Sequence, residues 1–261
     1  MTVISISNIK GGVAKTTTAA TLAAGLNNKG YSVLMIDSDP QMNLTMCFRS
    51  EPEEGTPSLY GLYEHNGEKD LYDICQTLKI GLDLIPGDFD LCSADLEFFR
   101  KPGSLKILRK FLKSINEHYD YVIIDTPPNL GFLSLNAFMA SDYIVTPMAT
   151  DSFSLRAIRL LKSTLSEIES EAERKIPVLG VLLTRYQKDT IISKELEAHV
   201  VLAASLLDTT LFNSRIRQAT VVQQSQIAKM DLFQYDPKAK VTHDYQNFVD
   251  EFLERIKQHG C

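Results

Sequence analysis

Short apolar runs rich in Val and Ile alternate along the chain with longer segments of helical periodicity. The runs cover residues 3–7, 32–36, 82–85, 121–124, 143–146 and 178–183. Each run is apolar on both faces and ends at polar or turn residues, which is typical of buried parallel strands. The segments between the runs are long enough to form crossover helices. The pattern therefore predicts an α/β fold: a doubly wound, mostly parallel twisted sheet flanked by helices.

Apolar residues at helical spacing predict the helices of this fold. The predicted helices are residues 16–29, 89–100, 104–118, 132–140, 154–174, 193–207 and 242–258. Residues 49–80 mix Pro, Gly and acidic residues with short apolar stretches, and we interpret them as an excursion at the sheet edge. Because no internal repeat or linker interrupts the pattern, we expect a single domain over residues 1–261.

The composition is that of a globular protein, with 44% hydrophobic and 23% charged residues. No stretch approaches the ~20 apolar residues that cross a bilayer. The four cysteines are dispersed and form no C-x-x-C pair, so we expect a cytoplasmic protein without disulfides or metal clusters. The formal net charge is −6, and the acidic excess lies within residues 1–150. A local basic surface later in the chain is compatible with this distribution.

The strongest chemical signal is residues 8–17, NIKGGVAKTT, which follow the first predicted strand and open a helix. Small residues here let backbone amides curve around a phosphate, and the helix N-terminus adds its dipole. In such a P-loop, Lys15 reaches phosphate oxygens and the Thr16 hydroxyl ligates Mg²⁺. The pattern G-x-x-x-x-G-K-[ST] fails twice, because Ile9 and Ala14 occupy its glycine positions. If residue 14 needs a positive φ, alanine there costs about 1–2 kcal/mol.

Carboxylates follow two other predicted strands. Asp37 and Asp39 lie in the sequence VLMIDSDPQ, and Asp125 lies in YVIIDTPP. The carboxyl ends of parallel strands share one sheet edge, so these side chains are expected to converge on the P-loop. Asp125 would then bind Mg²⁺ through water, and Asp37 or Asp39 would order an attacking water. The alternative is that Asp37 and Asp39 only form turns or cap helices.

Three motifs together resemble the deviant-Walker ATPases, specifically the ParA/Soj branch that segregates plasmids and chromosomes. They are KGGVxKTT at residues 10–17, DxDPQ at 37–41 and IDTPP at 124–128. The resemblance spans essentially the whole chain and includes YDP at 235–237. It implies ATP and Mg²⁺ as cofactors, weak basal ATP hydrolysis, and a homodimer that sandwiches the nucleotide.

The resemblance assigns roles residue by residue. Lys10 is similar to the signature lysine that contacts the partner subunit's ATP, Lys15 binds phosphate, and Thr17 binds the α-phosphate. Asp39 matches the aspartate that positions the hydrolytic water. Lys10, Lys15 and Asp39 are therefore the candidate catalytic residues. The candidate nucleotide-binding residues are Lys10, Gly11, Gly12, Val13, Ala14, Lys15, Thr16, Thr17, Asp39 and Asp125.

The metal roles also follow from the resemblance. Thr16 is the expected direct Mg²⁺ ligand, and Asp37 and Asp125 are expected to act on the metal through water. Ala14 departs from the family, which usually has glycine before the P-loop lysine. Hydrolysis is accordingly expected to be slow, and a hydrolysis-deficient nucleotide switch is an alternative interpretation of the chain.

Residues 209–230 contain Arg215, Arg217 and Lys229 and no acidic residue. The resemblance implies that Arg217, with Arg215 beside it, binds double-stranded DNA without sequence preference. It also implies a ParB-like, centromere-bound partner that stimulates hydrolysis. Arg185 and Lys188 are weaker candidates for the same surface. Because the first strand starts within a few residues of Met1, we expect no helix-turn-helix ahead of the P-loop.

The other alternative is a MinD-like regulator of cell division that binds membranes through its last helix. Residues 242–258 place apolar side chains on one helical face, and the opposite face is largely acidic. An anionic membrane would repel that acidic face. We therefore expect this helix to dock on the protein body and the protein not to bind membranes.

Overall fold

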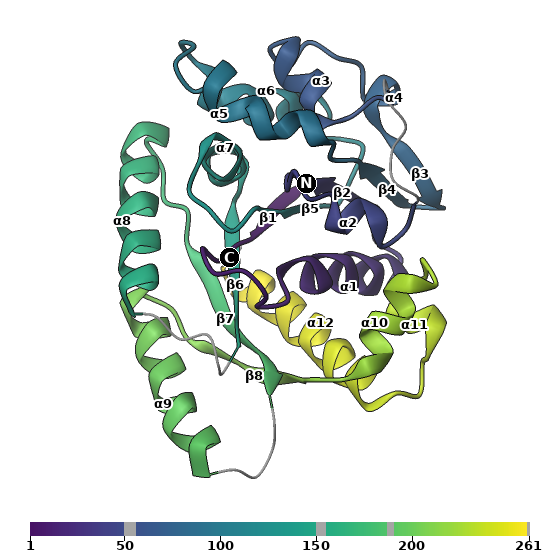
Figure 1. The fold of residues 1–261 in the computed structure, drawn as a ribbon, viewed down its shortest axis with the longest axis vertical. Coiled ribbons are helices and arrows are strands. Elements are labelled where there is room, and N and C mark those ends of the chain that lie inside the picture. The colour runs from purple at the N-terminus through teal and green to yellow at the C-terminus, as the bar shows by residue number, and fades with distance from the viewer. Residues whose placement is uncertain (50–55, 150–154, 187–190, 260–261) are drawn as a thin grey trace.

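In the computed structural model, which describes residues 1–49, 56–149, 155–186 and 191–259, eight strands form one sheet (Figure 1). The strands are β1 (Thr2–Ile6), β2 (Val33–Asp37), β3 (Gln76–Lys79), β4 (Leu82–Ile85), β5 (Tyr121–Asp125), β6 (Tyr143–Ala149), β7 (Val178–Tyr186) and β8 (Leu211–Arg217). Their order is β3-β4-β2-β5-β1-β6-β7-β8. Neighbours pair in parallel except β3 and β4, which are antiparallel. The prediction of a mostly parallel sheet is confirmed.

Helices cover both faces of the sheet, as Figure 1 shows. One layer contains α1 (Lys15–Asn28), α2 (Asn43–Met46), α10 (Thr220–Ile227), α11 (Leu232–Tyr235) and α12 (Lys240–His259). The other contains α3 (Leu59–Glu64), α4 (Leu71–Ile74), α5 (Ala94–Glu97), α6 (Ile107–Ser114), α7 (Phe132–Ala140), α8 (Leu155–Ala172) and α9 (Ile191–Leu206). The result is a three-layer α/β/α arrangement.

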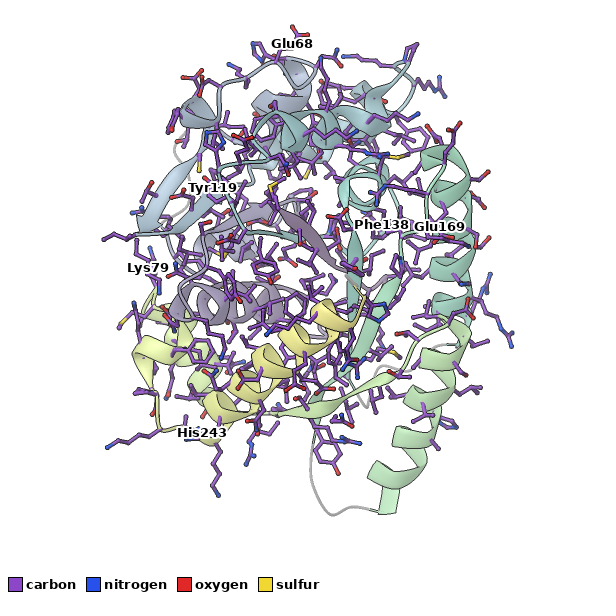
Figure 2. The ribbon with its side chains drawn as sticks, turned by 180° about the vertical axis from the view of Figure 1, so that it is seen from behind. Glu68, Lys79, Tyr119, Phe138, Glu169 and His243 are labelled. Atoms are coloured by element: carbon purple, nitrogen blue, oxygen red, sulfur yellow. The ribbon has the colours of Figure 1, made fainter. Side chains whose placement is uncertain are left out.

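Alternate strand residues fill the two cores. In β1, Ile4 and Ile6 pack with α1 and α12, whereas Val3 packs with the opposite layer. In β2, Val33 faces α1 and Leu34 faces the other side. Figure 2 shows Phe138 in the interior and Glu68, Lys79 and His243 at the periphery. Burial on both faces explains why these strands appear in the sequence as uninterrupted apolar runs.

The last helix docks on the protein body as predicted. Val241, Tyr245, Phe248, Val249 and Phe252 of α12 are buried in the core shared with α1 and the sheet. Across the described residues, no helix combines the length and apolar character needed to cross a membrane.

Two helix predictions are wrong in extent. Residues 89–100 form a 3₁₀ turn, Phe89–Ser93, followed by the single turn of α5. Asp88 accepts a hydrogen bond from the Leu91 amide at 3.1 Å, and the Ser93 hydroxyl donates to the Asp90 carbonyl at 2.8 Å. Such local bonds compete with a continuous helix. Residues 104–118 likewise contain only a 3₁₀ turn and α6.

The edge strands β3 and β8 were not predicted from the sequence. The described residues of 56–80 form the predicted excursion at the sheet edge, since they contribute α3, α4 and β3. At the other edge, β8 buries Phe212 and Ile216, and its remaining positions are half-buried or exposed. It therefore lacks the apolar run that identifies the central strands.

Candidate nucleotide site at the carboxyl edge of the sheet

The P-loop connects β1 to α1 through a left-handed residue. Ala14 has φ 64° and ψ 34°, so the positive φ considered from the sequence is confirmed. Within the described residues, no side chain caps the first turn of α1, and that turn has no acidic residue. The N–H groups at the start of α1 are therefore available to an anion, and the helix dipole favours one there.

Side chains from the ends of β1 and β7 hold the P-loop in place. Asn8 donates to the Pro147 carbonyl at 2.8 Å and accepts from the Lys10 amide at 3.0 Å. From the end of β7, Thr184 donates to the Val13 carbonyl at 3.0 Å and Arg185 donates to the Gly12 carbonyl at 3.1 Å. Sequence reasoning missed Asn8 and Thr184, and it considered Arg185 only as a DNA contact. Their partners lie on distant strands, which only the topology reveals.

Lys15 is 7% exposed and points back along the loop. Its Nζ donates to the Lys10 carbonyl at 3.3 Å. Burial lowers the pKa of Lys15, while the nearby charges of Asp125 and Asp39 oppose that shift. The predicted lysine and carboxylates thus lie together at the carboxyl edge of the sheet.

Asp125 has one oxygen paired and one unpaired. The Thr16 hydroxyl donates to Asp125 Oδ2 at 2.6 Å. Asp125 Oδ1 is buried and has no hydrogen-bond partner in the part of the chain that the structure describes. Burial, and then the Asp37 charge, raise the pKa of Asp125, although Thr16 and Lys15 oppose the shift. A buried oxygen without a partner beside a threonine hydroxyl fits a hydrated Mg²⁺.

Asp37 lies beside Asp125, but its carboxylate accepts hydrogen bonds from α2. The two aspartates are register partners on β2 and β5. The amide and hydroxyl of Thr45 both donate to Asp37 Oδ2 at 2.7 Å, and the Asp39 amide donates to Oδ1 at 3.2 Å. Complete burial raises the pKa of Asp37 to about 6. Asp37 therefore anchors α2, and its metal role stays a prediction.

Asp39 is 7% exposed and lines the cavity above the P-loop. Its Oδ1 accepts from the Gln41 amide at 2.9 Å, which is the turn role weighed as an alternative. This turn holds the Asp39 carboxylate near Lys15, and its negative charge acts to raise the pKa of Lys15. Structural and chemical roles are therefore compatible in Asp39.

A cavity of about 710 Å³, the P-loop cavity, opens over these residues. It is lined by Gly11, Gly12, Ala14, Lys15, Thr16, Thr17, Asp39, Gln41, Asn43, Met46, Cys47, Pro128, Gln223, Gln226 and Ile227. Gln226 Nε2 donates to Thr17 Oγ1 at 3.2 Å and so ties α10 to the P-loop. Sequence reasoning missed α2 and α10 as cavity walls. The one available signal was the spacing of Gln223 and Gln226, which places both on one helical face.

The two candidate DNA-binding arginines lie on β8. Arg217 forms a two-point ion pair with Asp244 of α12, with Nε–Oδ2 at 2.6 Å and Nη2–Oδ1 at 2.8 Å. Arg215 Nη1 donates to the Asn213 carbonyl at 2.7 Å. Lys188, a weaker candidate, lies outside the described residues.

Arg217 and Arg185 line a second cavity of about 340 Å³, the arginine cavity. Gly12, Ala14 and Thr17 line both this cavity and the P-loop cavity. The P-loop is thus the shared wall between the predicted nucleotide site and the predicted DNA-binding arginine.

Comparisons with known proteins agree with this arrangement. The AAA_31 family model, described as an AAA domain, matches residues 1–178. The chain is 31% identical to the chromosome-partitioning ATPase Soj of Thermus thermophilus, over 98% of this chain and 96% of Soj. The chain belongs to the ParA/Soj family. Among ParA/Soj proteins, the chromosome partitioning protein ParA of Caulobacter vibrioides is 29% identical over 97% of this chain and 94% of its own.

Solved structures share the fold of this ParA/Soj chain. Cobyrinic acid a,c-diamide synthase of Mycobacterium smegmatis, with a bound ATP analogue and magnesium, superposes with a TM-score of 0.84 at 27% identity. The superposition covers 98% of this chain and 96% of that one. Apo McdA of Cyanothece superposes with a TM-score of 0.81 at 26% identity, over 97% of this chain and 99% of McdA. The P-loop ATPase fold is therefore established for this chain.

Proposed function

We propose that this chain is a partition ATPase that binds Mg·ATP at the P-loop and hydrolyses it slowly. The observation that carries the proposal is the contact of Thr16 with Asp125 beside buried Lys15, beneath a cavity of about 710 Å³. A glycine-rich turn that binds no ligand would not explain why a buried lysine and a buried carboxylate lie beside the same cavity. The similarity to Soj and ParA over nearly the whole chain supports the same role.

The residues of the carboxyl edge divide the work of binding and hydrolysis. Lys15 and the first amides of α1 hold the phosphates, and Thr17 contacts the α-phosphate. Thr16 and Asp125 hold Mg²⁺, which neutralises phosphate charge when bound. Asp39 orients the attacking water. Met46 and Ile227 are exposed apolar residues in the cavity lining, and they provide a surface for the adenine base of ATP.

Lys10 is the group that links two copies of the chain. Lys10, Gly11 and Gly12 are exposed in this structure, so a second subunit can cover them. Lys10 then contacts the partner subunit's ATP, and each nucleotide stabilises the homodimer because it binds both copies. Hydrolysis removes that link and releases the subunits.

In the dimer, two sets of Arg215 and Arg217 bind DNA phosphates without sequence preference. Affinity then falls steeply with salt, because each phosphate contact releases counterions. A ParB-like, centromere-bound protein stimulates hydrolysis and so ends DNA binding. The protein is accordingly located in the cytoplasm on the nucleoid.

The direct test is ATP binding by Lys15→Ala, measured by calorimetry with Mg²⁺. The variant should lose at least about a hundredfold in affinity, because the lysine makes charge-assisted bonds to the phosphates. Lys29→Ala is the matched control, since Lys29 lies at the far end of α1 and pairs with Asp250. Unchanged ATP affinity in Lys15→Ala, with normal circular dichroism, would contradict the P-loop assignment.

A hydrolysis-deficient switch is the second candidate, and the backbone of Ala14 favours it. A methyl group on a left-handed residue immediately before Lys15 strains the loop and sits on the cavity wall. Such a protein would bind ATP and dimerise with negligible turnover. Product release measured over many hours separates it from a slow ATPase.

A further inference from the structure

A cavity of about 190 Å³ lies at the amino edge of the sheet, opposite the P-loop. Its lining comes from α6, the starts of β1 and β6, and the turn that follows α8. Arg109 and Lys113 of α6 and Arg174 of the turn are its cationic residues. Among the described residues of the lining, Asp142 is the one carboxylate. This amino-edge cavity takes no part in the proposed ATPase.

Arg174 is fixed in the wall of the cavity. Its Nη2 donates to the carbonyls of Met139 at 3.0 Å and Ser141 at 2.6 Å. The turn itself is held because the Arg174 amide donates to the carbonyl of Glu169, which Figure 2 labels on α8. Within the described ranges, the buried Nε of Arg174 has no hydrogen-bond partner. The guanidinium is therefore positioned in advance and retains an unused donor.

Arg109 and Lys113 add positive charge that the protein leaves uncompensated. They are four residues apart on α6, a spacing at which like charges destabilise a helix. In the described part of the chain, neither has an ion-pair partner, whereas Lys110 of α6 pairs with Glu68 at 3.2 Å. Burial and then the Arg109 charge lower the pKa of Arg174, in the direction expected for crowded cations.

Asp142 offsets only part of this charge. Its Oδ2 accepts from the Val3 amide at 2.9 Å, and its Oδ1 lies 3.6 Å from Arg174 Nη1. One shared carboxylate thus faces three cations. The imbalance predicts that an anion from solution is attracted to the cavity.

We propose that the amino-edge cavity binds a phosphate-sized dianion, either free phosphate or a small phosphomonoester. The volume exceeds the roughly 30 Å³ that one water occupies in the liquid several-fold, which suits a tetrahedral oxyanion. Guanidinium groups match phosphate oxygens in geometry, and Lys113 supplies a movable point charge. The anion adds negative charge beside Arg174 and removes the repulsion between Arg109 and Lys113.

The test is calorimetric titration with inorganic phosphate at constant ionic strength, with chloride as the replaced ion. It is run on the full chain saturated with a non-hydrolysable Mg·ATP analogue, whose three phosphates fill the P-loop, and, in parallel, on Lys15→Ala, so that P-loop binding is removed in two ways. Arg109→Gln combined with Lys113→Gln should weaken phosphate binding by about tenfold or more, because two charge-assisted contacts are lost. Lys110→Gln, on the same helix, should stay within about twofold of the wild type.

Arg174 is left unchanged in these variants because its guanidinium donates hydrogen bonds to two backbone carbonyls and so stabilises the fold. The double variant should also unfold at a higher temperature than the wild type in phosphate-free buffer, since it removes repulsion between like charges. That measurement shows directly that the variant folds. Methyl phosphate as a second titrant separates the sources: binding of both ligands supports a phosphomonoester site, and binding of inorganic phosphate alone supports a free-phosphate site.

Three results would overturn the proposal. The first is equal phosphate affinity in the double variant and the wild type. The second is loss of all phosphate binding in Lys15→Ala. The third is weaker binding of random-sequence DNA by the double variant with unchanged phosphate affinity, which would make the surface a DNA contact.

Discussion

Ala14 places a methyl group where the chain turns left-handed, immediately before the lysine that the proposed function requires. For an L-residue this conformation costs about 1–2 kcal/mol, and glycine would avoid the cost. The loop is nevertheless held in place by Thr184 and Arg185 through the carbonyls of Val13 and Gly12. The surrounding contacts thus impose a conformation that the residue itself disfavours.

Replacing Ala14 by glycine should stabilise the protein by about 0.5–1 kcal/mol, because the relief of strain exceeds the added entropy of the unfolded chain. Thermal unfolding should show a midpoint higher by about 1–4 °C. Ala24→Gly, inside α1, is the control and should be destabilised by about 1 kcal/mol or more. A faster ATP turnover in Ala14→Gly would show that the methyl group slows hydrolysis. A lower melting midpoint in Ala14→Gly would contradict the strain argument.

At the scale of elements, α12 completes the edge of the sheet at β8. Glu251 accepts the amides of Asn213 at 2.7 Å and Ser214 at 2.8 Å, and it pairs with Arg255 at 3.0 Å. One carboxylate thus satisfies backbone donors that would otherwise be exposed to pairing with another strand. Burial by itself raises the pKa of Glu251, but these donors and Arg255 outweigh it and the net shift is downward.

Glu251→Gln should therefore lose about 1–3 kcal/mol of unfolding free energy at pH 7. Because the folded-state pKa lies below the usual 4.5, the stabilisation is present above that value and is lost as the pH falls through the folded-state pKa. Urea unfolding from pH 7 to pH 4 should show the difference between wild type and variant shrinking at the acid end. Glu254→Gln, on the exposed face of α12, should match the wild type throughout. A difference that grows toward acid would refute the assignment.

The same helix restrains Arg217. Asp244 binds the guanidinium at two points and also accepts the Arg217 amide at 3.1 Å, so a DNA phosphate must compete with a carboxylate. Asp244→Asn removes this competitor and should strengthen ATP-dependent binding to random-sequence DNA by about three- to tenfold, with a steeper salt dependence. Asp250→Asn changes the net charge equally but affects the pair with Lys29, so fluorescence anisotropy should report a smaller gain. Equal gains in the two variants would mean that only net charge matters.

The elements that sequence reasoning identified share a physical property. Buried strands such as β1, β2 and β5 appear as apolar runs, and the polar residues that follow them in the sequence mark the sheet edge that carries the candidate nucleotide site. By contrast, β8 depends on Glu251 for its edge contacts, and α2 is held by two hydrogen bonds from Thr45 to Asp37. These contacts involve isolated polar residues whose partners only the folded chain brings together. The cavity walls formed by α2 and α10 were missed for that reason.

At the scale of the whole molecule, the two predicted ligands lie on opposite sides of one loop. Gly12, Ala14 and Thr17 line both the P-loop cavity and the arginine cavity that contains Arg217. Arg185 connects the end of β7 to the Gly12 carbonyl in the same wall. Phosphates that reorder the P-loop would therefore act directly on the surroundings of Arg217, the predicted DNA-binding residue. The shared wall between the two cavities offers a physical connection between nucleotide binding and the proposed DNA binding.

The proposed dimer depends on Lys10, which is exposed in the single subunit. Lys10→Ala should bind ATP within about threefold of the wild type, because Lys15 supplies the phosphate contact within the subunit, yet it should remain monomeric in analytical ultracentrifugation with Mg·ATP. It should also lose ATP-dependent DNA binding, since two sets of arginines no longer act together. Lys238→Ala, another exposed lysine, should dimerise normally.

Anionic liposomes complete that experiment. The apolar face of α12 is buried in the core, so neither the wild type nor Lys10→Ala should bind anionic liposomes in any nucleotide state. ATP-dependent binding of the wild type to liposomes, without binding to DNA, would instead favour a MinD-like role. A Lys10→Ala variant that still dimerised would move the subunit contact away from the P-loop. In both cases the nucleotide site could remain intact, because Lys15, Thr16 and Asp125 belong to one subunit.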